Sequence, residues 1–313
     1  MPLPTVLMTD VIRSADQGQS HGGAYLIDLE SGSWRQVLDW DSHDISWEGR
    51  GMGRGLRGIA YDGDDIYIAA SDELFVFDPD FQLQRSHKCA CLHHAHEVFL
   101  DGRRLLVTST TYDAIVEFDL DQRLFTRGWH IRKETRPGPN GLPLSVRKFD
   151  PRIAKAVPGE DALHINSVWV ENGAILLSGT VLPVMLAIEG TRLSTRAKLP
   201  PGTHNARPFG GGVICNATEQ NCVLVADDQG RTRARLPIVT YPEDRVVSTG
   251  VPADYARQGF ARGLVTTDDG LVIVGSSPGT VTAYDLDSRK LLKSVNVTMD
   301  VRNAPHGLAL WPY

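Results

Sequence analysis

The sequence predicts an all-β fold, a six-bladed β-propeller closed by N- and C-terminal strands that share one blade. Helical periodicity is almost absent. Short runs of Val, Ile, Leu, Tyr and Trp alternate instead with Asp-Gly, Asn-Gly and Gly-Gly turns. One pattern of strand, tight turn and strand also recurs along the chain. Units of about 40 residues with about four strands each are typical of propeller blades.

The repeated unit begins with a polar residue and continues into an apolar strand, a tight turn and a second strand that ends in small residues. Several units continue into a third strand with an acidic end, such as LFVFDPD and TVTAYDLD. Units of this kind start at Leu56, Ala95, Ile165, Ala206 and Ala261. The recurrence of one motif favours a propeller over a sandwich or barrel, and we expect six blades rather than five or seven.

A further unit, PHGLALWPY, starts at Pro305 and stops at the C-terminus. The N-terminal runs TVLMTD and GGAYLIDLESGSWRQVLDW have the character of the strands that this unit lacks. A blade built from both chain ends would close the ring. We therefore expect residues 1–313 to form a single propeller domain, whose first blade combines about residues 1–45 with residues 303–313.

The 313 residues carry a net charge of −6, and 42% of them are apolar. Such an apolar fraction is ordinary for a globular protein, and the acidic balance disfavours a nucleic-acid surface, which needs a basic excess. No apolar run approaches the roughly 18 residues of a membrane span, and the N-terminus lacks the pattern of a secretory signal. We therefore expect a cytoplasmic protein without nucleic-acid or membrane partners, with its four cysteines reduced.

Polar residues open the repeated units, and the first strand of a propeller blade lines the central channel. The opening residues are Arg57, His96, Asn166, Arg207, Arg262 and His306. Further candidates two or three residues earlier are His94, His164, His204 and Asn205. Five of the ten histidines thus fall at blade starts, although a packed or water-filled channel needs no imidazole. This gathering predicts a functional site at one mouth of the channel.

Histidines from separate blades could share a transition metal ion (Fe, Zn or Cu), since neutral imidazoles are good ligands for such metals. The predicted ligands are His96, His164, His204 and His306. An open coordination position would activate water or dioxygen, and Glu97 would orient a histidine ring and act in catalysis. His204 has the opposite strand parity to Arg207, so it joins only where the backbone leaves regular strand geometry.

Arginines at the same mouth suit a small anionic substrate, because planar guanidinium groups bind carboxylates and phosphates well. The predicted substrate-binding residues are Arg57, Asn166, Asn205, Arg207 and Arg262, with Arg262 also catalytic. The leading hypothesis is a metal-dependent oxidoreductase, lyase or hydrolase that acts on this substrate. The alternatives are a non-catalytic propeller that binds a ligand or a protein, and a metal-free lyase or hydrolase that uses a His–Glu pair.

Two long insertions interrupt the repeat, at residues 132–161 and at residues 240–260. Insertions of this length in a compact repeat fold often cover a site. We expect both to form lids over the channel mouth.

The motifs at the blade starts resemble those of an uncharacterised bacterial family of unknown function, whose members are sometimes joined to tetratricopeptide repeats. The motifs are His96-Glu97, His164-x-Asn166, His204-x-x-Arg207 and Arg262-Gly263-Leu264, in the same order along the chain. The family commonly has Pro-His-Ser-Pro-Arg where this chain has Thr-His-Asn-Ala-Arg. The resemblance implies a propeller with a shared polar site and implies no particular reaction.

Overall fold

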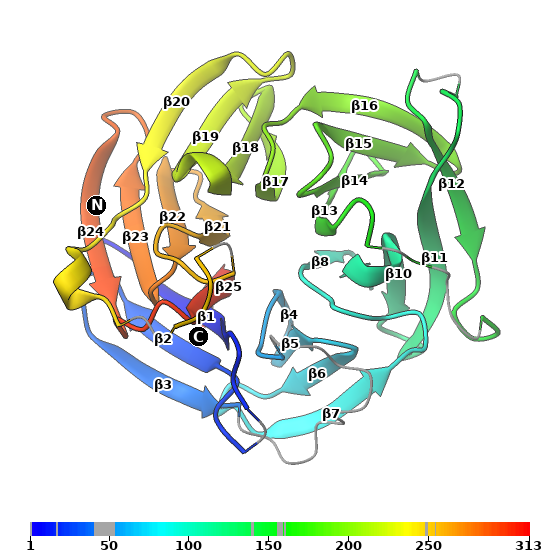
Figure 1. Ribbon diagram of the computed structural model, residues 1–313. Helices are drawn as coiled ribbons and strands as arrows, with labels where there is room; N and C mark the ends of the chain where they lie inside the picture. The colour runs from blue at the N-terminus through cyan, green and yellow to red at the C-terminus, as the bar shows by residue number, and fades with distance from the viewer. Residues whose placement is uncertain are drawn as a thin grey trace.

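Six antiparallel sheets surround a central axis in the computed structural model, which describes residues 2–16, 18–40, 54–138, 141–154, 159, 161–247, 250–253 and 255–313 (Figure 1). Five sheets have four strands each and the sixth has five. The predicted all-β, six-bladed propeller is confirmed. Short 3₁₀ helices occur at Thr110–Tyr112 (η1), Thr218–Gln220 (η2) and Glu243–Arg245 (η3).

In the second to sixth blades the strands run outward from the axis in chain order, because each strand is joined by a turn or loop to the next strand of the same sheet. The second blade contains β4 (Ile59–Asp62), β5 (Asp65–Ala70), β6 (Glu73–Phe77) and β7 (Leu83–Lys88). The fourth contains β13 (Ile165–Glu171), β14 (Ala174–Gly179), β15 (Val184–Glu189) and β16 (Arg192–Lys198). The fifth contains β17 (Thr203–Phe209), β18 (Gly212–Ala217), β19 (Cys222–Asp227) and β20 (Thr232–Pro237). The sixth contains β21 (Ala261–Thr266), β22 (Leu271–Ser276), β23 (Thr280–Asp285) and β24 (Lys290–Asn296).

The first blade joins the two ends of the chain. Its innermost strand is β25 (Asn303–Leu310), which pairs with β1 (Thr5–Ile12), and β2 (Gly23–Asp28) and β3 (Trp34–Asp39) complete the sheet. The buried Asp10 side chain ties the ends together: it accepts hydrogen bonds from Asn303 Nδ2 (2.9 Å) and from the backbone N–H of Gly23 (2.6 Å). Residues 41–45, which the sequence also assigned to this blade, lie outside the described residues.

The third blade has an additional outer strand. It contains β8 (Val98–Asp101), β9 (Arg104–Ser109), β10 (Ala114–Asp119), β11 (Leu124–Lys133) and β12 (Leu144–Phe149). Strand β12 pairs with β11 at the outer edge of the sheet, with Gly128 opposite Phe149. Much of the insertion at residues 132–161 therefore extends a blade on the outside of the ring. The prediction that this part of the insertion covers the channel mouth is wrong.

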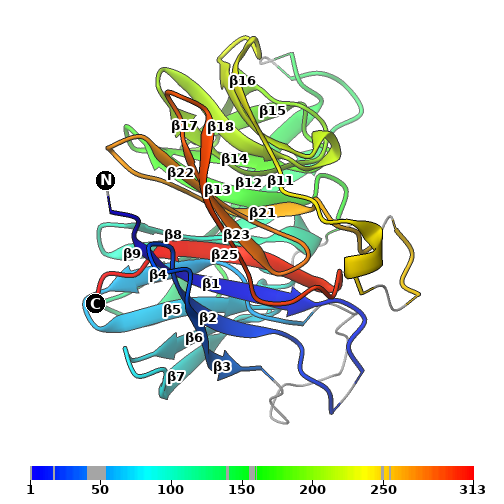
Figure 2. The same cartoon turned by 90° about the vertical axis from the view of Figure 1, so that its left-hand side faces the viewer.

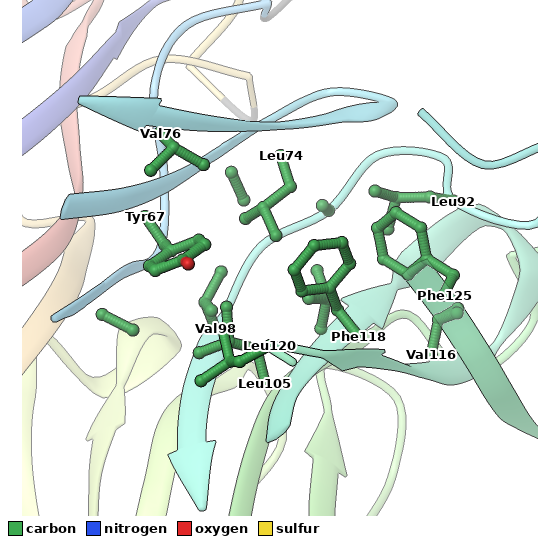
Figure 3. Packing of buried hydrophobic residues seen from close by; sticks show 14 residues of the cluster. Tyr67, Leu74, Val76, Leu92, Val98, Leu105, Val116, Phe118, Leu120 and Phe125 are labelled. Atoms are coloured by element: carbon green, nitrogen blue, oxygen red, sulfur yellow. The ribbon is translucent and has the colours of Figure 1, made fainter. Parts of the chain in front are cut away.

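Neighbouring blades pack face to face through apolar side chains. Between the second and third blades, Tyr67 and Leu74 from one sheet meet Leu105 and Phe118 from the other (Figure 3). The Phe118 ring lies edge-on to Phe125, with 5.1 Å between the ring centroids. Burying one such side chain stabilises the fold by about 1.5–3 kcal/mol. Comparable clusters between the other blades make the ring a continuous core.

The two faces of the ring differ in what they carry. Seen from the side, both chain termini lie at one face, and η3 with the loop that follows it lies at the other (Figure 2). Residues at several blade starts line one pocket together with Tyr255 and Phe260, which follow η3 in the chain, so they gather at that second face. Within the described residues we find no helix with the length and apolar character needed to cross a membrane.

Candidate functional site

A pocket of about 260 Å³ lies where the blade starts converge. Its lining consists of basic and aromatic side chains with one valine: Val11, Arg13, Arg57, His94, His96, His164, Tyr255, Phe260, Arg262 and His306. Five blades or their connecting loops contribute to it. Among the described residues, no carboxylate belongs to this lining. The predicted residues Arg57, His96, His164, Arg262 and His306 are therefore brought together at one mouth of the channel.

Four imidazole rings lie next to one another in the pocket. The His96 ring centroid is 4.6 Å from that of His94, 5.3 Å from that of His164 and 5.8 Å from that of His306. The centroids of His94 and His164 are 5.9 Å apart. Burial lowers the pKa of His96 and of His306 well below the ordinary value; the charge of Arg57 lowers both further, and that of Arg262 lowers the pKa of His306. Both rings are therefore neutral near pH 7.

Three histidines on different blades are anchored in the same way. Each directs Nδ1 at the backbone carbonyl oxygen two residues earlier: His96 at His94 (2.9 Å), His204 at Gly202 (3.2 Å) and His306 at Ala304 (2.8 Å). A carbonyl oxygen only accepts hydrogen bonds, so Nδ1 carries the proton in all three rings. In a neutral ring, Nε2 is then left with a free lone pair.

Threonines from the next turn of the same blades support two of these rings. Thr110 Oγ1 lies 2.8 Å from His96 Nδ1 and donates its own proton to the Ile165 carbonyl oxygen (2.6 Å). Thr218 Oγ1 is placed equivalently, 3.2 Å from His204 Nδ1, and donates to the Ala261 carbonyl oxygen (3.1 Å). Each threonine therefore fixes its ring with respect to the next blade.

His164 reaches the pocket from a different backbone position. Its Nδ1 lies 2.9 Å from Asp161 Oδ1, a carboxylate that only accepts when ionised. Both His94 and His164 adopt left-handed backbone geometry, with φ values of 57° and 51°. This conformation is uncommon for residues other than glycine. It turns the chain just before β8 and β13 and directs both side chains into the pocket lining.

Buried guanidinium groups set the electrostatics of the pocket. Burial lowers the pKa of Arg57 to about 9 and that of Arg13 to about 10, and the positive charge of Arg13 adds to the shift of Arg57. The pKa of Arg262 is lowered well below its ordinary value by burial and by neighbouring arginines. Among the described residues, neither Arg13 nor Arg262 forms an ion pair, and two nitrogens of Arg262, Nε and Nη1, are buried without a hydrogen-bond partner.

Aromatic residues from the insertion at residues 240–260 stack on these arginines. The Cζ atoms of Arg257, Arg13 and Arg262 lie 4.4, 5.0 and 5.2 Å from the Phe260 ring centroid. Arg13 is also 5.4 Å from the Tyr255 ring centroid. A cation over an aromatic face is attracted to it, which offsets part of the repulsion between like charges. This insertion thus supplies two residues to the lining of the channel mouth.

A second polar cluster lies outside the pocket lining and contains three predicted site residues. Asn205 Nδ2 donates to Glu97 Oε2 (3.0 Å), while Asn205 Oδ1 accepts from the backbone N–H of Gly263 (2.9 Å). Arg207 donates to the Leu264 carbonyl oxygen and lies over the Trp169 ring, 5.0 Å from its centroid. Burial raises the pKa of Glu97 to about 6, although Arg207 and Asn205 act against the shift.

Asn166 is likewise occupied by contacts within the fold. Its Nδ2 donates to Thr180 Oγ1 and to the Thr203 carbonyl oxygen, each at 3.0 Å, and its Oδ1 accepts from Ser167 Oγ (3.1 Å). These bonds tie the fourth blade to the fifth. The structure therefore places Asn166 at a blade start, as expected, but outside the pocket lining.

His204 is separated from the other predicted metal ligands. The register of β17 shifts between His204 and Arg207, which brings His204 to the blade position that His96 and His306 occupy. Its Nε2 is nevertheless buried without a partner, and the residue does not line the pocket. The pocket lining therefore contains His96, His164 and His306 of the four predicted ligands, and His204 lies outside it.

The histidine cluster meets only part of what a metal site requires. The anchored Nδ1 atoms suit ligation through Nε2, since metal-bound histidines usually donate their other N–H to a carbonyl or carboxylate. Within the described ranges, however, no three His, Cys, Asp or Glu side chains are arranged to hold a metal ion. The nearby arginines also repel a cation. The donor set therefore does not fit a metal in the arrangement seen here.

Arg13 and Tyr255 belong to the pocket but were not among the predicted site residues. Arg13 directly follows β1, the second strand of the shared blade, and so reaches the same mouth as His306. The signal available in the sequence was a basic residue straight after the apolar run TVLMTDVI. Tyr255 lies in a connecting loop, where no repeat pattern indicates which side chains turn inward. His94, which the sequence left as a further candidate, also lines the pocket.

The chain is similar in structure to many solved protein chains. It matches a chain of a nidogen–laminin complex with a TM-score of 0.60 and 12% identity, over 97% of both chains. It matches a protein of unknown function from Bacteroides caccae with a TM-score of 0.58 and 12% identity, over 99% of this chain and 100% of that one. At these identities the likeness shows the fold alone.

An enzyme is also among the similar structures. Virginiamycin B lyase from Staphylococcus aureus matches with a TM-score of 0.46 and 10% identity, over 78% of this chain and 70% of the lyase. A likeness this distant carries no argument about the chemistry of this pocket. No protein-family model matches the sequence, and no curated protein matches it. The structural neighbours thus include a protein of unknown function, as the resemblance implied, but the link to tetratricopeptide repeats has no support.

Proposed function

We propose that the pocket at the channel mouth binds a small anionic substrate. The observation that carries this proposal is that Arg13 and Arg262 line the pocket without any ion pair to a carboxylate of the described residues. Burying an unpaired charge is costly, and bringing like charges together adds to that cost. An anion in the pocket would offset both contributions. Its volume of about 260 Å³ suits a ligand slightly smaller than a typical drug-sized molecule.

The histidines give the pocket the means to act on such a ligand. His96 and His306 are neutral and present an unprotonated Nε2, which is the state a general base requires. The bound anion would lie beside both rings, because all these residues line one pocket. We therefore favour general-base catalysis over a purely binding role: the base would take a proton from the bound anion in a lyase, or from an attacking water molecule in a hydrolase. Glu97 lies outside the pocket lining and is not assigned as the base.

Anion binding can be tested by titration calorimetry with succinate and with inorganic phosphate at low ionic strength. Replacing Arg262 by Met preserves an unbranched aliphatic stem but removes the guanidinium charge. Anion binding should weaken about 10- to 100-fold, which is the usual contribution of a charge-assisted hydrogen bond. The control is Arg231→Gln, which removes a charge from an exposed arginine paired with Asp227. The proposal fails if neither anion binds, or if both variants weaken binding equally.

A metal-dependent reaction is the second candidate. The Nδ1 anchoring of His96 and His306 suits ligation through Nε2, but the described donor side chains would have to move to surround one metal ion. Elemental analysis of untagged protein tests this candidate. Less than about a tenth of an equivalent of any transition metal, with no uptake on reconstitution, would reject it. Under this candidate, His164→Ala and His306→Ala should each lose metal while remaining folded.

A further inference from the structure

We propose that the substrate is a hydroxylated dianion: a molecule with two negative charges that also carries at least one hydroxyl or N–H group. This inference rests on the proposed anion-binding function and names the chemical class of its ligand. The two arginines without ion pairs indicate the two negative charges of the ligand. The orientation of the histidine rings indicates its hydrogen-bond donor.

The number of charges follows from the two arginines without ion pairs. Arg13 is buried and Arg262 is half-buried at the pocket, with Nε and Nη1 of Arg262 shielded from solvent, and both arginines stack on the Phe260 ring. A ligand with one negative charge would leave one of these guanidinium groups uncompensated in a site of low polarity. A ligand with two negative charges matches both. Arg57 adds a third positive charge to the same lining, so a bound ligand with two negative charges does not give the occupied pocket a net negative charge.

The hydrogen-bond donor follows from the orientation of the histidine rings. Arginine side chains only donate hydrogen bonds, so they recognise the oxygens of the anion and nothing else. His96 and His306 have their Nδ1 protons committed to backbone carbonyls. Among the described residues, none donates a hydrogen bond to the Nε2 atom of either ring. The lining therefore offers acceptors as well as donors, and a plain dianion has no proton to give to them.

A hydroxyl or N–H group on the ligand is a better partner for the Nε2 atoms of His96 and His306 than a divalent cation is. A cation would lie beside three arginines, in a lining whose described residues include no carboxylate. No three donor side chains of the described residues are arranged around a common metal position. A ligand hydroxyl needs only one lone pair at hydrogen-bonding distance, and it brings no charge of its own.

The test compares pairs of ligands that differ only by a hydroxyl group, by titration calorimetry in the presence of a chelator. L-malate and succinate form the dicarboxylate pair, and 1,2-propanediol 1-phosphate and propyl phosphate form the phosphate pair. In at least one pair, the hydroxylated member should bind about 3- to 30-fold more tightly, the range expected for one hydrogen bond. The pair with the higher affinity identifies the carboxylate or phosphate source of the charge.

The variant His96→Phe keeps an aromatic ring but removes the acceptor, so it should lower the preference for the hydroxylated ligand at least threefold. His204→Phe is the matched control: His204 has the same Nδ1 anchoring, but its unpartnered Nε2 is buried outside the lining. That variant should keep the preference. The wild-type comparison needs no variant, so the test remains decisive even if a variant fails to fold.

The possible results separate the inference from the function on which it rests. If the hydroxylated and plain ligands bind equally well, anion binding stands and the inference is overturned. If no ligand of either pair binds, the anion-binding proposal itself fails. If the preference appears only without the chelator, a metal bridges the hydroxyl group and the inference is also overturned.

Discussion

His96 and His306 come from blades on either side of the blade of Arg57, and their ring centroids lie 5.8 Å apart in the pocket. Each ring donates its Nδ1 proton to the carbonyl oxygen two residues earlier. The same local hydrogen bond therefore recurs in two blades. It leaves the Nε2 atoms of both rings as hydrogen-bond acceptors in one pocket. The following predictions test this arrangement and the ring that supports it.

Thr110 should orient the His96 ring for ligand binding. Replacing Thr110 by Val removes the hydroxyl group that links His96 Nδ1 to the Ile165 carbonyl oxygen, and should lower the free energy of unfolding by about 1–3 kcal/mol. Thr218→Val removes the equivalent link at His204, outside the pocket lining. Both variants should lose stability in denaturant titrations, but only Thr110→Val should weaken anion binding. Equal affinities would contradict the role assigned to Thr110.

Phe260 should hold the arginines of the pocket together. Replacing it by Leu removes the ring that faces Arg13, Arg257 and Arg262. Each cation–π contact contributes about 0.5–1 kcal/mol, so anion affinity should fall about 5- to 20-fold. Phe260→Tyr keeps the ring face and should bind nearly as tightly as the wild type. Titration calorimetry measures all three proteins, and unchanged affinity in Phe260→Leu would show that the arginines need no aromatic support.

Asp10 should make stability depend on pH. Burial raises its pKa from 3.8 to about 6, so the folded state binds a proton more readily than the unfolded state between these values. The free energy of unfolding therefore falls as the pH rises from about 4 to about 6, by about 3 kcal/mol for this group. Glu97, whose pKa is also raised to about 6, acts in the same direction.

The variant Asp10→Asn isolates the contribution of Asp10. It still offers an oxygen to the Gly23 N–H, and the Asn303 amide can turn to accept from the new side chain. Denaturant titrations between pH 4.5 and pH 7.5 should show a smaller loss of stability with rising pH than in the wild type. If the free energy of unfolding of the variant changed with pH as steeply as that of the wild type, Asp10 would be ionised in the folded protein without a cost in stability.

Gly307 should be needed where β25 meets the second blade. A Cβ atom at this position would lie 2.1 Å from the Arg57 carbonyl oxygen and 2.3 Å from Thr9 Oγ1. Gly307→Ala must therefore push the backbone of Arg57 aside. We expect a loss of stability of about 1–3 kcal/mol, as is usual for overpacking, together with weaker anion binding. Thermal unfolding and calorimetry measure the two effects, and wild-type values for both would show that the inner strands can separate freely.

The sequence by itself determined the architecture, because the information for a propeller is local and repeated. Each unit carries its own strand pattern and turn residues, as in LRGIAYDGDDIYIAAS from Leu56, and the incomplete unit at Pro305 showed that the N-terminus must complete its blade. The polar residues at the blade starts followed from the same alignment. Arg57, His96 and His306 could therefore be expected at one mouth of the channel, where the structure brings them together.

Only the tertiary structure decided which of these side chains share a pocket. Asn205 and Arg207 face Glu97 and Trp169 instead, because a register shift in β17 changes the direction of its side chains. The left-handed backbone at His94 and the arrival of Arg13 depend on contacts between blades far apart in the sequence. Which side chains of a strand share a face follows from the local sequence, because neighbouring residues alternate between the two faces. The distance and orientation between side chains of different blades are set by how the blades pack, which no single repeat records.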